Sequence, residues 1–192
     1  LPDVPDVADA GHNAIDDFIR HRLVAAGLQP SPSAKPRELV RRMHYDLLGL
    51  PPEPAEVEHW AAVISGNHGQ LKQTGIAQLV NHLLDSPHYG EQWGRHWLDL
   101  VRYAETNSYE RDSAKPHVWR YRDYVIQSFN DDKPYDLFVT EQLAGDEIQD
   151  PTPDSIIATA YYRLGRWDDE PADPKLAFYD EIDDIITTTS QT

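Results

Sequence analysis

The sequence of 192 residues contains no cysteine, and positive charge is scarce in it. Without cysteine the chain forms no disulfide, has no thiolate nucleophile, and binds neither cysteine-ligated zinc nor covalent haem c of its own. Lysine and arginine number 17 against 33 acidic residues, which gives a net charge of −16. Phosphate groups bind mainly to clustered Lys and Arg, so this composition disfavours nucleic acid and anionic membranes as partners.

Long hydrophobic runs and strand patterns are also missing. No apolar stretch approaches the roughly 20 residues that a membrane-spanning helix needs, so we expect no membrane span in this segment. No alternating run of β-branched residues ends in a tight turn, as a β-hairpin would require. The G-x-S-x-G elbow, the P-loop, the dinucleotide fingerprint and the H-E-x-x-H zinc motif do not occur. The enzyme classes that use these motifs are therefore disfavoured.

Apolar residues recur at helical spacing in nine segments, which glycine and proline separate. Asn13 is placed to cap the first predicted helix, and Gly27 and Gly49 to end the first and the second. Thr152 and Asp173 are each followed by proline, a pair typical of a helix start, and they are placed to open the last two helices.

These signals predict an all-α fold, built as a single irregular domain of eight or nine helices over residues 13–192. A linker or N-terminal arm is expected over residues 1–12, where prolines and aspartates occur without an apolar period. Pro116 is the expected first residue of the sixth helix, and the eighth is expected to run without a break to Leu164. Because the chain starts at Leu1 without methionine, we expect it to be a processed product or an excised piece of a longer parent protein.

Two charged residues fall among apolar neighbours on consecutive predicted helices. On a helical wheel, Arg122 lies about 40° from Val118, inside the apolar arc of the sixth helix. Glu141 lies between apolar residues on the seventh. An unpaired charge in a core is costly, so we expect Arg122 and Glu141 to contact each other. Such a pair would fix the register of the two helices or border a pocket.

The connection between the fifth and sixth predicted helices is rich in polar residues. The carboxylates of Glu105, Glu110 and Asp112 lie close in sequence to Arg120 and Arg122. Paired carboxylates perform acid–base catalysis or bind a hard cation such as calcium, whereas most charged loops are only solvated. The candidate pocket residues are His96, Glu105, Tyr109, Glu110, Asp112, Arg120, Arg122, Asp123 and Glu141.

A second acidic cluster precedes the last predicted helix. Carboxylates there suit the positive end of the helix dipole, and a calcium site is the alternative. The candidate metal ligands are Asp168, Asp169, Glu170 and Asp173. Within the helix, a solvated side opposite the isoleucines is expected to carry Asp180, Asp183 and Asp184.

Several motifs follow in order over nearly the whole chain after about Asn13, and together they resemble one family. On these residues the sequence is similar to the planctomycete cytochrome c-associated domain of unknown function. The motifs include Asp46-Leu47-Leu48-Gly49-Leu50-Pro51-Pro52, Arg95-His96-Trp97-Leu98-Asp99, Trp119-Arg120-Tyr121-Arg122-Asp123 and Tyr179-Asp180-Glu181-Ile182-Asp183-Asp184.

The resemblance implies a context more than a mechanism. Members of that family look like parts of large exported proteins, so it implies an extracytoplasmic location, in the periplasm or at the cell surface. It also implies a cytochrome c-like domain, of the same or a neighbouring protein, as partner. Haem c would be carried by the longer parent protein and not by this chain, with His88 or His96 as a candidate axial ligand.

Two functions follow from these observations. The first is a helical structural module of an exported cytochrome c-associated protein, supporting haem or linked to electron transfer. The alternative is a carboxylate-based enzyme or binding domain, assisted by calcium, that acts on polysaccharide or another exported substrate. An open cleft lined by tryptophan and the candidate carboxylates would favour the enzyme, whereas mutually paired side chains would favour the module.

Overall fold

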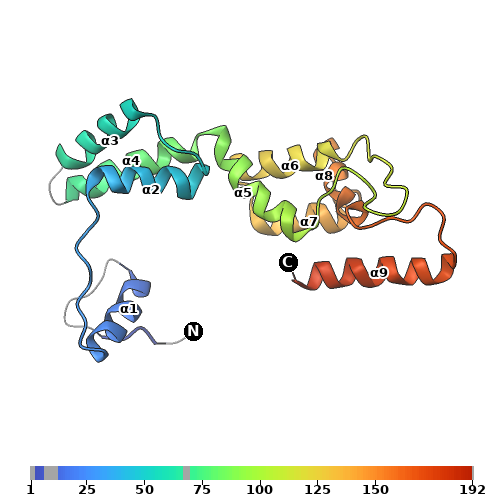
Figure 1. The fold of residues 1–192 in the computed structure, drawn as a ribbon, viewed down its shortest axis with the longest axis horizontal. Coiled ribbons are helices and arrows are strands. Elements are labelled where there is room, and N and C mark those ends of the chain that lie inside the picture. Colours follow the sequence, from blue (N-terminus) through green and yellow to red (C-terminus); the bar gives the residue numbers. More distant parts are fainter. Residues whose placement is uncertain (1–2, 7–12, 67–69, 192) are drawn as a thin grey trace. The chain divides into compact units, whose positions relative to one another are not determined.

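The computed structural model describes residues 3–6, 13–66 and 70–191, and these residues form helices joined by loops (Figure 1). Nine α-helices and one short 3-10 helix occur among them. The described residues contain no strand, and an isolated antiparallel bridge joins Thr106 to Ala114. The predicted all-α fold class is confirmed. No helix within the described ranges is long and apolar enough to cross a membrane.

The chain divides into two compact units, residues 1–35 and residues 36–192. The first unit contains α1 (Ala14–Ala25), which begins as predicted, because Asn13 Oδ1 accepts a hydrogen bond from the N–H of Asp16 at 3.0 Å. Gly27 follows the helix in the left-handed region, with a φ of 67°. Much of the predicted linker, residues 1–2 and 7–12, lies outside the described residues, so that boundary stays a prediction.

The second unit begins with three helices that share a small apolar core. They are α2 (Pro36–Leu48), α3 (Pro54–Gly66) and α4 (Gln70–Leu84). Gly49, with a φ of 68°, ends α2 where the sequence predicted. The side chains that these helices bury together are Val40, Ile64, Leu79 and Leu83.

A larger core forms around α5 (Pro87–Leu100), α6 (Trp119–Asn130) and α7 (Tyr135–Ala144), with the short α8 (Pro153–Ala158) against α6 and α7. Glycines let α5 and α6 approach closely, because Gly90 and Gly94 are buried against α6. α5 also packs on α2, and it therefore belongs to both groups of helices. The buried side chains of this core are Val101, Tyr121, Tyr124, Val125, Phe138, Ala158, Tyr161 and Leu164.

Two helix boundaries differ from the predictions. α6 starts at Trp119 and not at Pro116, because residues 116–118 form a turn in which N–H groups bond carbonyl oxygens three residues back, as Val118 does to Lys115 at 3.2 Å. The Lys115 ammonium before this turn donates to the carbonyl oxygens of Leu164 and Gly165, at 3.2 and 3.0 Å. The predicted eighth helix ends early, at Ala158, and continues as the 3-10 helix η1 (Thr159–Arg163). The Thr159 hydroxyl donates to a carbonyl three residues back at 2.7 Å, a bond that competes with regular α-helical geometry.

The last helix, α9 (Pro174–Gln191), begins at the predicted cap, because Asp173 Oδ1 accepts the N–H of Lys175 at 3.0 Å. Asp180 and Asp183 are exposed, and Asp184, whose side chain is 44% exposed, also forms an ion pair with Arg102. Ile186 is 60% exposed. α9 is therefore held through polar contacts, while part of its apolar side faces solvent.

The close contact at Gly90 generates a stability prediction. A Cβ atom at this position would lie 2.3 Å from the carbonyl oxygen of Ile126, whereas one at Gly66 would meet nothing within 4 Å. Gly90→Ala should therefore lower the free energy of unfolding by about 1–3 kcal/mol. Gly66→Ala should change it by less than about 1 kcal/mol. Urea denaturation followed by circular dichroism measures both, and equal effects would contradict the tight α5–α6 packing.

Candidate functional site

The predicted contact between Arg122 and Glu141 is wrong, because each side chain has other partners. The guanidinium of Arg122 reaches back to the loop before α6, where Nη1 lies 2.9 Å from Oε1 of Glu105. It also bonds Oδ1 of Asp123 at 3.1 Å. The Arg122 side chain is 39% exposed, so this long side chain carries its charge out of the apolar arc and toward water.

Glu105 joins Arg122 to the end of α5 through Tyr103, whose hydroxyl donates to Oε1 of Glu105 at 3.1 Å. Burial, together with the hydrogen bond and charge of Glu105, raises the pKa of Tyr103 to about 12. Burial alone would lower the pKa of Arg122, but the bond to Asp123 and the neighbouring negative charges raise it. Tyr103, Glu105, Arg122 and Asp123 thus form one connected polar group at the start of the loop.

The remaining polar residues of the loop fix its own shape and attach it to residues 166–170. Asp112 has a left-handed φ of 39°, and its Oδ1 accepts the N–H of Ser108 at 2.8 Å. Hydrogen bonds from Thr106 and Ser108 lower the pKa of Asp112. Both terminal nitrogens of Arg111 bind the carboxylate of Glu170 at 2.6 Å. These groups are therefore occupied by structural contacts.

The other candidate residues do not join this group in a single site. Arg166 lies over the ring of Tyr109, 4.8 Å from its centre, and Arg120 lies 5.6 Å from the ring of Trp119. Glu110 is exposed, as is His96, whose ring lies 5.5 Å from that of Trp93. Glu141 does not join this group either, because it is buried against Lys133 and Tyr124.

The predicted metal ligands lie near a cavity of 740 Å³ between residues 166–173 and α9, which Asp168, Asp169 and Asp173 line. Each of the four carboxylates already has a partner in the protein. Asp169 accepts from Asn107 and Ser113, Asp168 accepts the N–H of Glu170, and Glu170 binds Arg111. Across the described residues, no three His, Asp or Glu side chains lie close enough to hold a metal ion. Calcium binding stays a prediction from the sequence.

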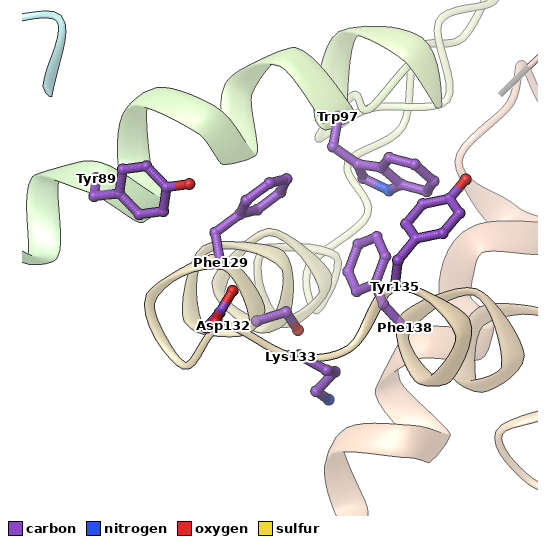
Figure 2. A pocket seen from close by; sticks show the side chains of 8 residues that line it. Tyr89, Trp97, Phe129, Asp132, Lys133, Tyr135 and Phe138 are labelled. Carbon is purple, nitrogen blue, oxygen red and sulfur yellow. The ribbon is translucent and has the colours of Figure 1, made fainter. Parts of the chain in front are cut away.

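A different cavity, of 330 Å³, lies between α5 and the junction of α6 with α7 (Figure 2). We call it the aromatic pocket, and none of the candidate residues from the sequence lines it. Figure 2 shows Trp97, Tyr135 and Phe138 close together, with the Tyr89 ring pointing from α5 toward Phe129. The lining residues are Tyr89, Trp97, Ser128, Phe129, Asp132, Lys133, Tyr135 and Phe138.

Contacts behind the aromatic pocket fix the orientation of its rings. The Trp97 ring meets Phe138 edge-on at 4.8 Å, and its Nε1–H donates to Tyr121 and to Gln142, at 3.1 and 3.2 Å. The hydroxyl of Tyr121 in turn donates to Oε1 of Gln142 at 2.5 Å. Phe138 also stacks nearly parallel on Tyr124, with ring centres 5.8 Å apart. The pocket wall is therefore preformed.

A buried ion pair lies beside this wall. Nζ of Lys133 lies 2.5 Å from Oε2 of Glu141, and these side chains are only 18% and 8% exposed. The hydroxyl of Tyr124 donates to the same Glu141 oxygen at 2.8 Å, and Lys133 Nζ lies 4.6 Å from the Tyr124 ring centre. Burial, with the hydrogen bond and charge of Glu141, raises the pKa of Tyr124.

The sequence contained a signal for the aromatic pocket, namely aromatic residues four apart along α5 at Tyr89, Trp93 and Trp97. Such a stripe is typical of a helix face that packs into a core. In the structure Trp97 is half-buried and Trp93 is 38% exposed. Helical spacing alone does not show that α6 and α7 leave these rings at the edge of a cavity.

The family model described as PSCyt2, a protein of unknown function (DUF1549), matches residues 14–192. Searches of curated proteins and of solved structures give no match.

The buried ion pair generates a prediction. Lys133→Met leaves the Glu141 carboxylate buried without its cation, which should lower the free energy of unfolding at pH 7 by about 3–5 kcal/mol. The Arg111–Glu170 pair, with both side chains 65% exposed, offers a matched control, and Arg111→Met should cost about 0–1 kcal/mol. Chemical denaturation at pH 7 measures both effects, and equal losses in the two variants would contradict a buried Lys133–Glu141 ion pair.

The raised pKa of Tyr103 predicts a loss of stability in alkali. The folded state holds the phenolic proton more tightly than the unfolded state, whose tyrosines titrate near pH 10.0. The contribution of Tyr103 is therefore complete below pH 10 and is lost as the pH rises toward its folded pKa of about 12. Between pH 9 and about pH 11, Tyr103→Phe should lose less free energy of unfolding than the unmodified protein. Tyr135→Phe, at an exposed ring, is the control and should behave like the unmodified protein.

Proposed function

The chain belongs to the PSCyt2 family of proteins of unknown function (DUF1549), and from that premise we propose that it is a non-catalytic helical module that supports a haem-bearing partner. The partner would be the cytochrome c-like domain of the same or a neighbouring exported protein. The observation that carries the proposal is that the candidate charged side chains pair with structural partners at separate places and do not gather around one pocket.

Arg122, Glu141 and Arg111 illustrate this pairing. Arg122 binds Glu105 and Asp123, Arg111 binds Glu170, and Glu141 binds Lys133. These contacts tie loops to helices, and they lie on different parts of the unit formed by residues 36–192. Acid–base catalysis requires titratable groups that converge on one accessible position. Their dispersal in structural pairs therefore favours a module whose task is to bind.

The link to haem rests on the family resemblance of the motifs. The chain lacks the cysteines that attach haem c, so it would support a haem carried by the partner and would not hold one itself. Two histidines on α5 could reach such a partner. His96 is exposed, and His88 is half-exposed with its Nδ1 2.8 Å from Oε2 of Glu91. A carboxylate at one ring nitrogen leaves the other nitrogen of His88 for a metal.

The enzyme alternative has less support. Hydrolysis of a glycoside commonly uses two carboxylates that flank the scissile bond, about 5–10 Å apart. The aromatic pocket could accept a sugar ring, but its lining has a single carboxylate, that of Asp132. Glu141, which lies behind the wall, is buried against Lys133 and Tyr124.

A binding experiment tests the proposed function. The cytochrome c-like module of the parent protein, loaded with haem, is titrated into this chain by calorimetry and by optical spectroscopy. We expect a one-to-one complex and a shift of the Soret band. His88→Gln and His96→Gln test the two histidines, one of which should remove the shift. His117→Gln, at another exposed histidine, is the control and should keep it.

Two results would contradict the proposal. One is the absence of any complex between the chain and the haem-loaded module. The other is release of reducing sugar from polysaccharide by the chain alone, lost in Asp132→Asn, which would instead establish the enzyme.

A further inference from the structure

Aromatic rings form most of the wall of the aromatic pocket. Five of its eight lining residues are aromatic, from α5, α6 and α7. Trp97 and Phe138 are held in place from behind, and Tyr89 and Phe129 are half-buried, so their outer surfaces remain accessible. The face of an aromatic ring carries partial negative charge and attracts a cation that lies within about 6 Å of its centre. The walls of the pocket therefore suit a cationic group.

The charged residues of the lining point to the same ligand. Asp132 is exposed, and its carboxylate takes part in no hydrogen bond or ion pair within the described part of the chain. The positive charge of Lys133 is offset by Glu141 at 2.5 Å, and Figure 2 shows its side chain directed away from the rings. The free charge at the pocket is thus negative. The chain as a whole, at −16, adds long-range attraction for positive partners.

We propose that the aromatic pocket binds the ammonium or guanidinium group of a lysine or arginine side chain on a partner protein. The rings would surround the cation, and the Asp132 carboxylate would pair with it at the rim. The inference deepens the proposed function and rests on it, because such a side chain would be a contact through which the module holds its partner. The volume of 330 Å³ is sufficient for the end of one such side chain.

A neutral sugar ring is the competing ligand, since it also stacks on aromatic side chains. It would need several directed hydrogen bonds, for which the lining offers the hydroxyls of Tyr89 and Tyr135 and the carboxylate of Asp132, while two other polar groups are already used. The Ser128 hydroxyl donates to the carbonyl oxygen of Tyr124 at 2.7 Å, and Lys133 is bound to Glu141. A cation needs only the ring faces and one carboxylate. The observations therefore favour the cation.

The test uses small probes with matched charges and shapes. Tetramethylammonium is compared with tert-butanol, and N-acetyl-arginine methylamide with its neutral citrulline counterpart. Binding to the full chain is followed by NMR through the Nε1–H signal of Trp97, assigned with a Trp97→Phe variant. We expect saturable shifts of this signal with both cations and none with either neutral probe. Methyl β-glucoside is added as the sugar probe.

Three variants locate the binding. Tyr89→Leu removes a ring face but keeps an apolar side chain, and should weaken cation binding by roughly 2- to 30-fold. Asp132→Asn removes the rim charge, and asparagine tolerates the left-handed φ of 49° at this position, so the loop should be preserved. It should weaken binding severalfold. Asp131→Asn is the control, because Asp131 is an exposed neighbour that does not line the pocket, and its effect should stay within twofold.

Circular dichroism and thermal unfolding establish that each variant is folded before binding is measured. The proposal is overturned if neutral probes bind as well as the cations, if the glucoside alone shifts the Trp97 signal, or if Tyr89→Leu and Asp132→Asn, both folded, bind like the unmodified chain. Failure here is distinguishable from failure of the proposed function. A module that binds the cytochrome c-like domain equally well in Asp132→Asn would retain its function and lose only this contact.

Discussion

The buried carboxylate of Glu141 is the constraint on which the arrangement of α6 and α7 depends. A charge at 8% exposure requires compensation, and the protein supplies it with the Lys133 ammonium and the Tyr124 hydroxyl. Lys133 lies in the short connection between the two helices, Tyr124 on the first and Glu141 on the second. One oxygen atom therefore determines how both helices and their connection meet. Phe138, stacked on Tyr124, is positioned by the same contact.

The aromatic pocket depends on this ion pair in two ways. Lys133 is drawn toward Glu141 and away from the rings, which leaves Asp132 as the free charge at the pocket (Figure 2). The pair also fixes Tyr124, against which Phe138 packs, while Gln142 holds the indole of Trp97 from the other side. A polar network that is fully hydrogen-bonded makes the neighbouring apolar wall rigid. Preorganised rings lose little freedom on binding, and for that reason the pocket suits recognition.

Local signals in the sequence were sufficient for most of the fold. Caps such as Asn13, Asp173 and Gly49 act within one helical turn, so their sequence positions predict the helix ends directly. α6 begins after a turn at residues 116–118, next to Lys115, whose bonds to carbonyl oxygens about 50 residues away in the chain no local pattern contains. The helical wheel correctly placed Glu141 on the buried side of its helix. It could not identify the partner, because a long side chain such as Arg122 can leave the face from which it starts.

The polar loop resembled a catalytic site in the sequence because its charges meet partners that lie far away along the chain, and these contacts exist only in the folded structure. Clustered carboxylates and arginines have the composition of an active site, and their role depends on which charges they meet in space. Arg111 meets Glu170 and Arg122 meets Glu105, pairs separated by 59 and 17 residues. Those contacts use the charges to attach a long connection that has few apolar residues of its own. The aromatic stripe of α5 presents the converse case, since its spacing indicated a core, and only the approach of α6 and α7 leaves its rings at the edge of a cavity. The sequence therefore shows which chemical groups are available at each position. Tertiary contacts decide which of these groups remain free to bind or act on another molecule.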